Sequence, residues 1–266
     1  MNRLITVAIT WLIASCTSNS ARIDDLAHAA KLQRAEIEVD GLRSIVYTRA
    51  TSSDARLIVF LEGDGQPWVG GVIPAEDPTT RDPLALKLLM RTPGTTAYIG
   101  RPCYQDARAA RCTSDLWTQG RYSPIVVETM RAAIKQTADS LRASEIVLVG
   151  YSGGGVLAVL LAERLENVAG VVTVAANLDI DAWTSHHRYL PLTQSLNPAR
   201  SEQSHDWPEV HLTGTRDEVV PSALNASYFE RFPRAQQWKL EQRGHVCCWI
   251  DEWESLWPKI QAAIEP

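Results

Sequence analysis

A glycine-rich segment between an apolar run and a helical pattern constrains this chain most. The segment, 150–154, has the form G-x-S-x-G with Ser152 at its centre; the apolar run 145–149 precedes it and an apolar helical pattern, 155–165, follows. A strand that turns sharply into a helix needs glycine on both sides of the turn, because a side chain there would obstruct the backbone. The pattern therefore predicts a strand, a tight turn that exposes Ser152, and a helix.

Apolar runs and helical patterns alternate along the chain from about residue 35. This alternation is typical of α/β proteins, in which helices cover a mainly parallel sheet. Several runs are apolar throughout, as strands buried on both faces are. We expect strands over 35–39, 44–47, 57–61, 96–99, 146–149, 171–174, 210–212 and 237–240.

Two further helices have clear signals. One should follow Ser123 and run to about Leu141, because serine is a good cap and Pro124 suits the first helical position. Near the C-terminus, tryptophan and aliphatic residues recur at helical spacing from Trp249, and Pro258 should break or restart that helix. We expect this apolar stripe to pack against the sheet, with a membrane-facing tryptophan surface as the alternative.

The start of the chain has the features of a secretory signal peptide. Arg3 supplies a positive charge, an apolar stretch runs from Leu4 to Ala14, and small residues precede Cys16. The stretch is too short to cross a bilayer, which takes about 20 apolar residues. Residues 13–16 resemble the lipobox of bacterial lipoproteins, and this resemblance implies that Cys16 is lipidated. An unmodified Cys16 behind an apolar leader is the alternative.

The lipoprotein resemblance also implies a location. Because Thr17 is not an aspartate, the resemblance implies that, if the source is Gram-negative, the protein is anchored at the outer membrane, on its periplasmic face. We expect a signal peptide over 1–15, a polar tether over 16–34 and one folded domain over 35–266.

Four cysteines remain after Cys16, an even number that suits an oxidising compartment. We expect a disulfide between Cys103 and Cys112, because they flank a polar stretch with no hydrophobic face of its own; two free buried thiols are the alternative. Cys247 and Cys248 are adjacent and could be a vicinal pair or two free residues. The cysteines contain no C-x-x-C pair, which is the local spacing that zinc sites commonly have, and we expect no metal.

The charge of the chain argues against nucleic acid as a partner. The net charge is -5, the isoelectric point is near 5.7, and no basic cluster accompanies an aromatic platform.

Over about residues 32–264, the chain resembles the α/β-hydrolase superfamily. The resemblance implies a mostly parallel central sheet with helices on both faces, and a nucleophile, an acid and a histidine in that chain order. Ser152 takes the nucleophile position, Asp217 lies in a loop similar to the family's acid loop, and His245 follows the last strand. Asp179, after an earlier strand, is the alternative acid.

These three residue types suit one chemistry. A serine hydroxyl is a poor nucleophile until a base takes its proton, and histidine titrates near neutral pH. A buried carboxylate fixes the tautomer of the imidazole and stabilises its charged form. The resemblance therefore predicts a triad of Ser152, Asp217 and His245.

Two backbone N–H groups should form an oxyanion hole, at Gly153 and at Asp64. The segment 62–65 resembles the family's H-G-x-G turn with Glu62 in place of the histidine; a plain glycine turn is the alternative. Arg101 could bind a substrate anion or form a structural ion pair.

Residues 177–207 fall between two predicted strands, where the family commonly carries a lid over the site. We expect a small lid there, and we expect His186 and His187 to belong to it rather than to bind metal.

The sequence therefore predicts a serine hydrolase that cleaves a carboxylic ester or thioester through an acyl-enzyme on Ser152, without a cofactor. Its expected partners are a small-molecule or lipid ester and a membrane, through the anchor. The fold hosts many chemistries, so two alternatives stay open: a peptidase or amidase, and a non-catalytic envelope binding protein.

Overall fold

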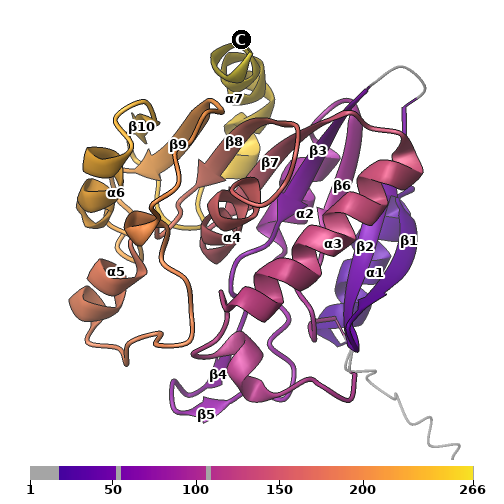
Figure 1. Ribbon diagram of the computed structural model, residues 1–266, viewed down its shortest axis with the longest axis horizontal. Coiled ribbons are helices and arrows are strands. Elements are labelled where there is room, and N and C mark those ends of the chain that lie inside the picture. The colour runs from indigo at the N-terminus through magenta and orange to yellow at the C-terminus, as the bar shows by residue number, and fades with distance from the viewer. Residues whose placement is uncertain (1–17, 52–54, 106–108, 266) are drawn as a thin grey trace, which may run out of the picture.

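An eight-stranded sheet crosses the molecule and carries helices on both faces (Figure 1). The computed structural model describes residues 18–51, 55–105 and 109–265. The strand order is β1-β2-β6-β3-β7-β8-β9-β10; β2 pairs antiparallel with both of its neighbours, and every other pair is parallel. The strands are β1 (Gln33–Val39), β2 (Leu42–Arg49), β3 (Arg56–Leu61), β6 (Thr95–Ile99), β7 (Glu145–Tyr151), β8 (Val168–Val174), β9 (Glu209–Gly214) and β10 (Gln236–Leu240).

All eight predicted strands are present, each within a few residues of its expected bounds. The central strands β3, β7 and β8 are buried almost throughout, which explains their unbroken apolar runs. The edge strands β1 and β10 are more exposed and more polar. The prediction of a mostly parallel sheet between helices is confirmed.

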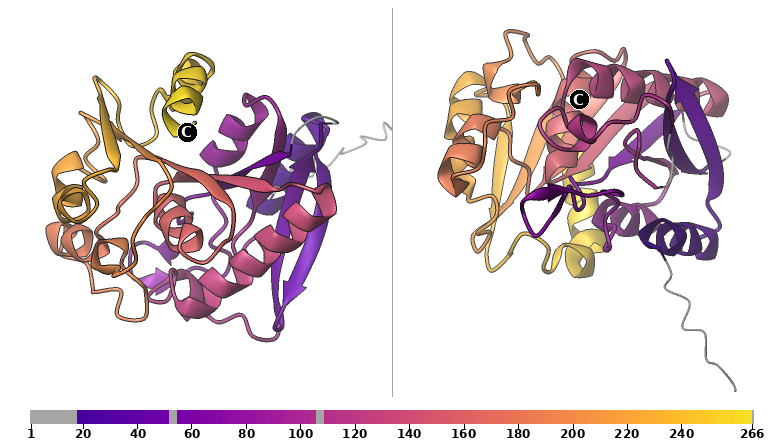
Figure 2. Two further views of the ribbon diagram at one scale, coloured as in Figure 1. Left: turned by 45° about the horizontal axis from the view of Figure 1, so that its top comes forward. Right: turned by 90° about the horizontal axis from the view of Figure 1, so that it is seen from below.

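Helices cover the two faces of the sheet in separate groups. One face carries α3 (Pro124–Leu141) and α4 (Gly153–Ala162), which pack in one apolar cluster. The other face carries α1 (Asn19–Ala29), α2 (Leu84–Met90) and α7 (Trp249–Ile264), which pack in a second cluster. Figure 2 shows both groups from two further directions.

Smaller elements lie mostly in the loops at one end of the sheet. A two-stranded hairpin of β4 (Trp68–Val69) and β5 (Ile73–Pro74) follows β3, and Gly70 and Gly71 at its tip both have positive φ, as its tight turn requires. The remaining elements are α5 (Ile180–His187), α6 (Ala226–Arg231), and the short 3-10 helices Ser114–Trp117, Pro198–Arg200 and Ser222–Asn225.

Helix α3 has the predicted bounds. Ser123 occupies the N-cap position and Pro124 the first turn, although the Ser123 hydroxyl makes no capping hydrogen bond. The helix ends at Leu141, and the following residue, Arg142, caps it with a left-handed φ of 56°.

The prediction that Pro258 breaks the C-terminal helix is wrong. Helix α7 continues through Pro258 to Ile264. Proline removes one backbone hydrogen bond, but the helix buries Trp253, Trp257 and Ile260 on either side of it, and this packing holds the helix together. The tryptophan stripe packs against the sheet, as expected, rather than facing outward.

The structure also differs from the polar tether expected over 16–34, within the part of it that is described. Helix α1 begins after Ser18, whose hydroxyl accepts the N–H of Ala21. Ile23 and Ala27, one turn apart, are both 1% exposed and pack against the sheet. Two apolar residues in a polar segment are a weak sequence signal, but they suffice to dock one helical face.

Two disulfides are present. One joins Cys103 to Cys112, as predicted, and the other joins the neighbours Cys247 and Cys248. Of the helices in the described ranges, none has the length and apolarity needed to cross a membrane.

Candidate active site

The backbone at Ser152 has the tight turn that the glycine motif predicts. Strand β7 leads directly into Ser152, whose φ of 50° and ψ of −124° are unusual for a residue with a side chain, and α4 starts at the next residue. A Cβ at Gly150 would lie 2.2 Å from the carbonyl oxygen of Gly154, and a Cβ at Gly154 would lie 2.2 Å from that of Leu61. Only glycine fits at these two positions, so the motif is a steric requirement of the turn.

The three predicted side chains meet at this turn. Nε2 of His245 lies 3.0 Å from Oγ of Ser152, and Nδ1 of His245 lies 2.9 Å from Oδ2 of Asp217. With Nδ1 donating to the carboxylate, Nε2 is left to accept the serine proton. The side chain of Asp217 is fully buried and that of His245 is 13% exposed, so the acid is shielded while the base is open to a substrate.

Two backbone groups fix the orientation of Asp217. Its Oδ1 accepts the N–H of Val219 at 2.9 Å and that of Val220 at 2.7 Å, which leaves Oδ2 for His245. Asp179, the alternative acid, has a different role: it caps α5 by accepting the N–H groups of Asp181 and Ala182. The geometry therefore selects Asp217 over Asp179 as the partner of His245.

A buried tryptophan holds the loop that carries His245. The indole N–H of Trp249 donates to the carbonyls of Gly244 and His245, at 3.1 and 3.0 Å. The ring of Tyr151 lies 5.3 Å from the imidazole. In the sequence, Trp249 is one position in the apolar stripe of the last helix, and that pattern does not indicate this contact.

The two predicted oxyanion donors lie on either side of Ser152. The N–H of Gly153 is in the first turn of α4, where no preceding turn supplies a carbonyl. A Cβ at Gly63 would lie 3.4 Å from that of Ser152, so the loop after β3 passes directly beside the nucleophile. Within the described residues, the N–H of Asp64 in this loop donates to no acceptor. Neither N–H group has a backbone acceptor among the described residues.

The carboxylate of Asp64 is held in a cationic cluster. Arg101 donates to its Oδ1 at 2.7 Å, Arg121 donates to its Oδ2 at 2.8 Å, and the hydroxyl of Tyr122 donates to the same carboxylate at 2.8 Å. Burial opposes the charge on Asp64, but the two guanidinium groups outweigh it and hold the pKa of this carboxyl below its ordinary value. Of the two roles considered for Arg101, the structure has the ion pair.

This cluster also lies against the nucleophile turn. A Cβ at Gly153 would lie 2.0 Å from Oδ1 of Asp64 and 2.5 Å from the hydroxyl of Tyr122. The loop of Asp64 and the turn of Ser152 are thus fixed against each other. Arg121 and Tyr122 were not predicted from the sequence, because nothing in their own segment indicates the contact with Asp64.

Glu62, at the position of the family's histidine, is a buried structural acceptor. Its two oxygens accept the N–H of Gly63 and the N–H of Ala85 at the start of α2, both at 3.1 Å. Burial raises the pKa of Glu62 to about 7, although these hydrogen bonds favour its charged form. Glu62 therefore ties the oxyanion loop to α2.

The segment 177–207 packs beside the acid loop through α5. The indole N–H of Trp183 and Nε2 of His187 both donate to the carbonyl of Val219, at 2.9 and 2.8 Å. His186 contacts His187 edge to face. In the part of the chain that the structure describes, no three histidine, cysteine or acidic side chains are grouped to hold a metal ion.

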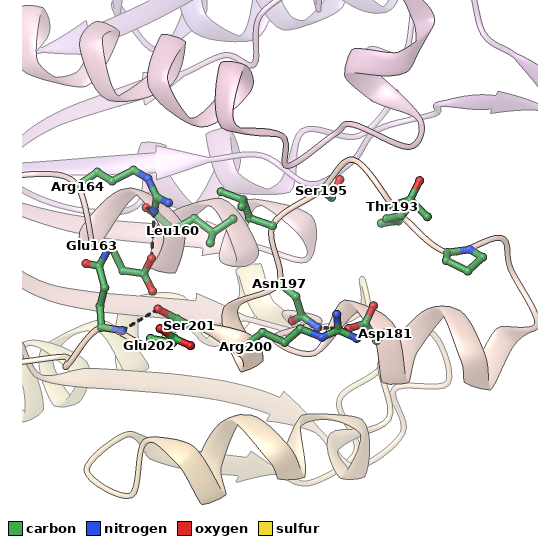
Figure 3. Close-up of a pocket in the computed structure, with 14 residues that line it drawn as sticks. Leu160, Glu163, Arg164, Asp181, Thr193, Ser195, Asn197, Arg200, Ser201 and Glu202 are labelled. Carbon is green, nitrogen blue, oxygen red and sulfur yellow. Dashed lines mark hydrogen bonds and ion pairs between the residues drawn. The ribbon is translucent and has the colours of Figure 1, made fainter.

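A large groove of about 780 Å³ lies between α4 and this segment, away from Ser152. Figure 3 shows that charged side chains in it face one another: Arg164 pairs with Glu163 at 3.0 Å and Arg200 with Asp181 at 2.8 Å. None of the lining residues belongs to the triad or to the oxyanion loop. Both arginines of the groove are therefore paired with carboxylates that also line it.

Solved structures share this architecture at low sequence identity. An esterase of Pyrococcus furiosus is 14% identical, with a TM-score of 0.64 over 88% of this chain and 92% of that one. A membrane phospholipase A described as a bacterial virulence factor is 15% identical, with a TM-score of 0.55 over 92% of this chain and 90% of its own. A predicted CIB-like hydrolase of Thermoplasma acidophilum is 16% identical, with a TM-score of 0.53 over 88% of this chain and 96% of its own. No family model matches the sequence, and no curated protein matches it.

Proposed function

The chain has the α/β-hydrolase fold, and we propose that it is a serine hydrolase that cleaves carboxylic esters or thioesters. The observation that carries this proposal is the continuous pair of hydrogen bonds from Ser152 through His245 to Asp217. Fold likeness alone does not give a reaction, because this fold hosts many. The esterase and phospholipase among the structural neighbours agree with an ester substrate.

In the proposed acylation step, Oγ of Ser152 attacks the ester carbonyl carbon while Nε2 of His245 takes the hydroxyl proton. The carbonyl oxygen becomes an oxyanion, which the N–H groups of Gly153 and Asp64 stabilise. Asp217 stabilises the imidazolium that forms. Collapse of the tetrahedral intermediate releases the alcohol or thiol, which receives the proton from Nε2.

Deacylation repeats the steps with water as the nucleophile. His245 removes a proton from a water molecule, the resulting hydroxide attacks the acyl-enzyme, and the proton returns to Oγ of Ser152 as the acid leaves. Side chains and backbone groups supply every step, so the proposal includes no cofactor.

A fluorophosphonate probe and a pair of chromogenic substrates test the proposal. We expect the probe to label the wild type and not Ser152→Ala, and the wild type to hydrolyse 4-nitrophenyl butyrate. Ser255→Ala is the matched control, because this serine lies on the exposed side of α7 and only bonds within its helix. A wild type that the probe does not label would favour the non-catalytic binding protein. A wild type that hydrolyses the 4-nitroanilide of butyric acid as fast as 4-nitrophenyl butyrate would favour the amidase.

We further propose that the protein is a lipoprotein, anchored through Cys16 on the periplasmic face of the outer membrane. The support is the signal-peptide pattern and the lipobox resemblance, and these residues lie outside those that the structure describes. Cys16→Ser should move the protein out of its wild-type membrane fraction or leave it unprocessed. If both proteins fractionate alike, there is no anchor at Cys16.

A further inference from the structure

Exposed apolar side chains gather at one end of the molecule. Among the described residues, eight large apolar side chains are exposed, and all except Met90 lie in the β4–β5 hairpin or in segments that follow α5, Asp217 or His245 in the chain. Single exposed apolar residues are ordinary on a protein surface, but such a concentration at one end is not. We call these seven side chains the apolar rim: Val69, Val72, Ile73, Tyr189, Leu190, Val219 and Val246.

Each part of the rim adjoins part of the active site. The hairpin of β4 and β5 starts four residues after Asp64, Val219 bonds Asp217 through its N–H, and Val246 directly follows His245. Figure 2, right, looks onto this end of the molecule and shows the hairpin in front of the sheet. The hairpin, Val219 and Val246 therefore each lie close in the chain to a residue of the proposed site.

The lid segment brings its own apolar residues to the same place. The ring of Tyr189 stacks on His187 with centroids 5.2 Å apart, and His187 donates to the carbonyl of Val219. Leu190, the next residue, is 72% exposed. Within the described part of the chain, most of this apolar side chain is therefore left uncovered.

The start of the described chain lies at this end too. The side-chain amide of Asn19 donates to the carbonyl of Thr79 at 3.0 Å, and the carbonyl of Pro78 accepts the N–H of Gln66 just before the hairpin. One residue, Thr17, separates Cys16 from Ser18, which allows a span of at most about 7 Å. A lipid on Cys16 would therefore hold this end of the molecule close to a bilayer.

We propose that the apolar rim docks on a lipid bilayer, so that Ser152 opens toward the membrane and takes acyl esters carried by lipids. This inference rests on the proposed function and names its substrate class. The seven side chains are uncharged, so burial of apolar surface at the interface drives docking, and docking depends little on salt or on anionic lipid. Because the rim belongs to the loops of the active site, docking and access to the substrate occur together.

Photolabelling tests the docking without any need for activity. The mature lipoprotein is reconstituted in phosphatidylcholine vesicles that contain a phosphatidylcholine with a diazirine on its acyl chain, and the labelled peptides are mapped by mass spectrometry. Label should appear on residues 69–73 and 189–190 and not around Met90, and Ser152→Ala should give the same map. Label confined to other surfaces would overturn the proposal. A bifunctional cross-linker that joins two copies of the protein through the hairpin would also overturn it, because it would assign the rim to a second copy.

Hydrolysis in the same vesicles tests the substrate class. The measured quantity is the ratio of two hydrolysis rates: the rate on 4-methylumbelliferyl oleate, which dissolves in the bilayer, divided by the rate on the water-soluble 4-methylumbelliferyl acetate. Val72→Ser combined with Ile73→Ser should lower this ratio at least tenfold, whereas Met90→Ser, the same change at the far end of α2, should leave it at the wild-type value. A wild type that cleaves neither ester would refute the proposed function. Docking on the bilayer is tested separately, by the map of photolabelled peptides. A ratio that is equal in all three proteins would refute the substrate class alone.

Discussion

The carboxylate of Asp64 offers the sharpest test of how the oxyanion loop is held. Asp64→Asn keeps the shape of the side chain and its backbone N–H, but removes the charge that Arg101 and Arg121 share. The side chains of these arginines are 2% and 6% exposed, so water cannot replace the lost partner. The asparagine would also turn an N–H₂ group toward a guanidinium donor.

The magnitude follows from the burial of this cluster. Removal of one partner from a buried ion pair typically destabilises by about 3–5 kcal/mol, because the remaining charge stays buried without compensation. We expect a loss of this size in the free energy of unfolding from urea titration. We also expect kcat on an activated ester to fall by about 10²–10³ with a smaller change in KM, as when one oxyanion donor is lost.

Asp139→Asn is the matched control. Asp139 pairs with Lys135 on the exposed side of α3, where both side chains are more than 60% exposed, and such a pair contributes less than about 1 kcal/mol. If Asp64→Asn unfolds at the urea concentration of the wild type, the cluster does not stabilise the fold. If it folds and retains its kcat, the position of the oxyanion donor does not depend on the carboxylate.

Three other predictions concern the triad, the pH dependence of stability and the disulfide. Asp217→Asn should lower kcat by about 10⁴ without unfolding the protein, and adding Ser152→Ala should lower kcat little further. Asp179→Asn should lower kcat far less. If steady-state rates show the larger loss for Asp179→Asn, the acid is Asp179. Burial lowers the pKa of His205, but Glu163 and Glu209 outweigh it and raise this pKa to about 9. Charged His205 should therefore stabilise the fold by on the order of 3 kcal/mol below pH about 6.5, and this contribution should be lost as the pH rises through about 9. Unfolding titrations at several pH values should show this loss in the wild type and not in His205→Gln. Cys103→Ser combined with Cys112→Ser should lower stability by about 2–3 kcal/mol, as expected for a loop of this length, and non-reducing peptide mapping of the wild type should recover the two cysteines linked.

The sheet could be predicted from the sequence because its strands are buried on both faces. Each such strand needs a nearly unbroken apolar run, and that pattern is visible without any knowledge of its neighbours. The hairpin of β4 and β5 was missed because each strand has only two residues, too few for an alternating pattern. The Gly70-Gly71 pair between apolar residues was the available signal.

The residues of the triad could be predicted because each is tied to a local pattern: a glycine turn, a loop after a strand, and the end of the last strand. The side chains that support them could not. Tyr122 and Asp64 are 58 residues apart, and only the assembled fold brings them into contact. Trp249 supports the histidine loop through its indole N–H, but in the sequence it is one more apolar position on an amphipathic helix.

The end of the lid segment and the strand before the acid share one buried polar network. Glu209, in β9, accepts from the indole of Trp207 and pairs with His205, and it also bonds His211 in its own strand. His211 in turn lies 2.8 Å from the hydroxyl of Thr173 in β8. Burial of the carboxylate would favour its neutral form, but the two histidines outweigh this and lower its pKa.

This network couples the two elements that border the site. It fixes β9 against β8, and Asp217 lies three residues after the end of β9, so the same contacts set the position of the acid loop. At the other end of the lid segment, Trp183 bonds the carbonyl of Val219 in that acid loop. The lid segment is thus attached at one end to β9, which leads to the acid loop, and at the other end to the acid loop itself. A change that loosens the network should therefore affect the orientation of His245 as well as access to Ser152.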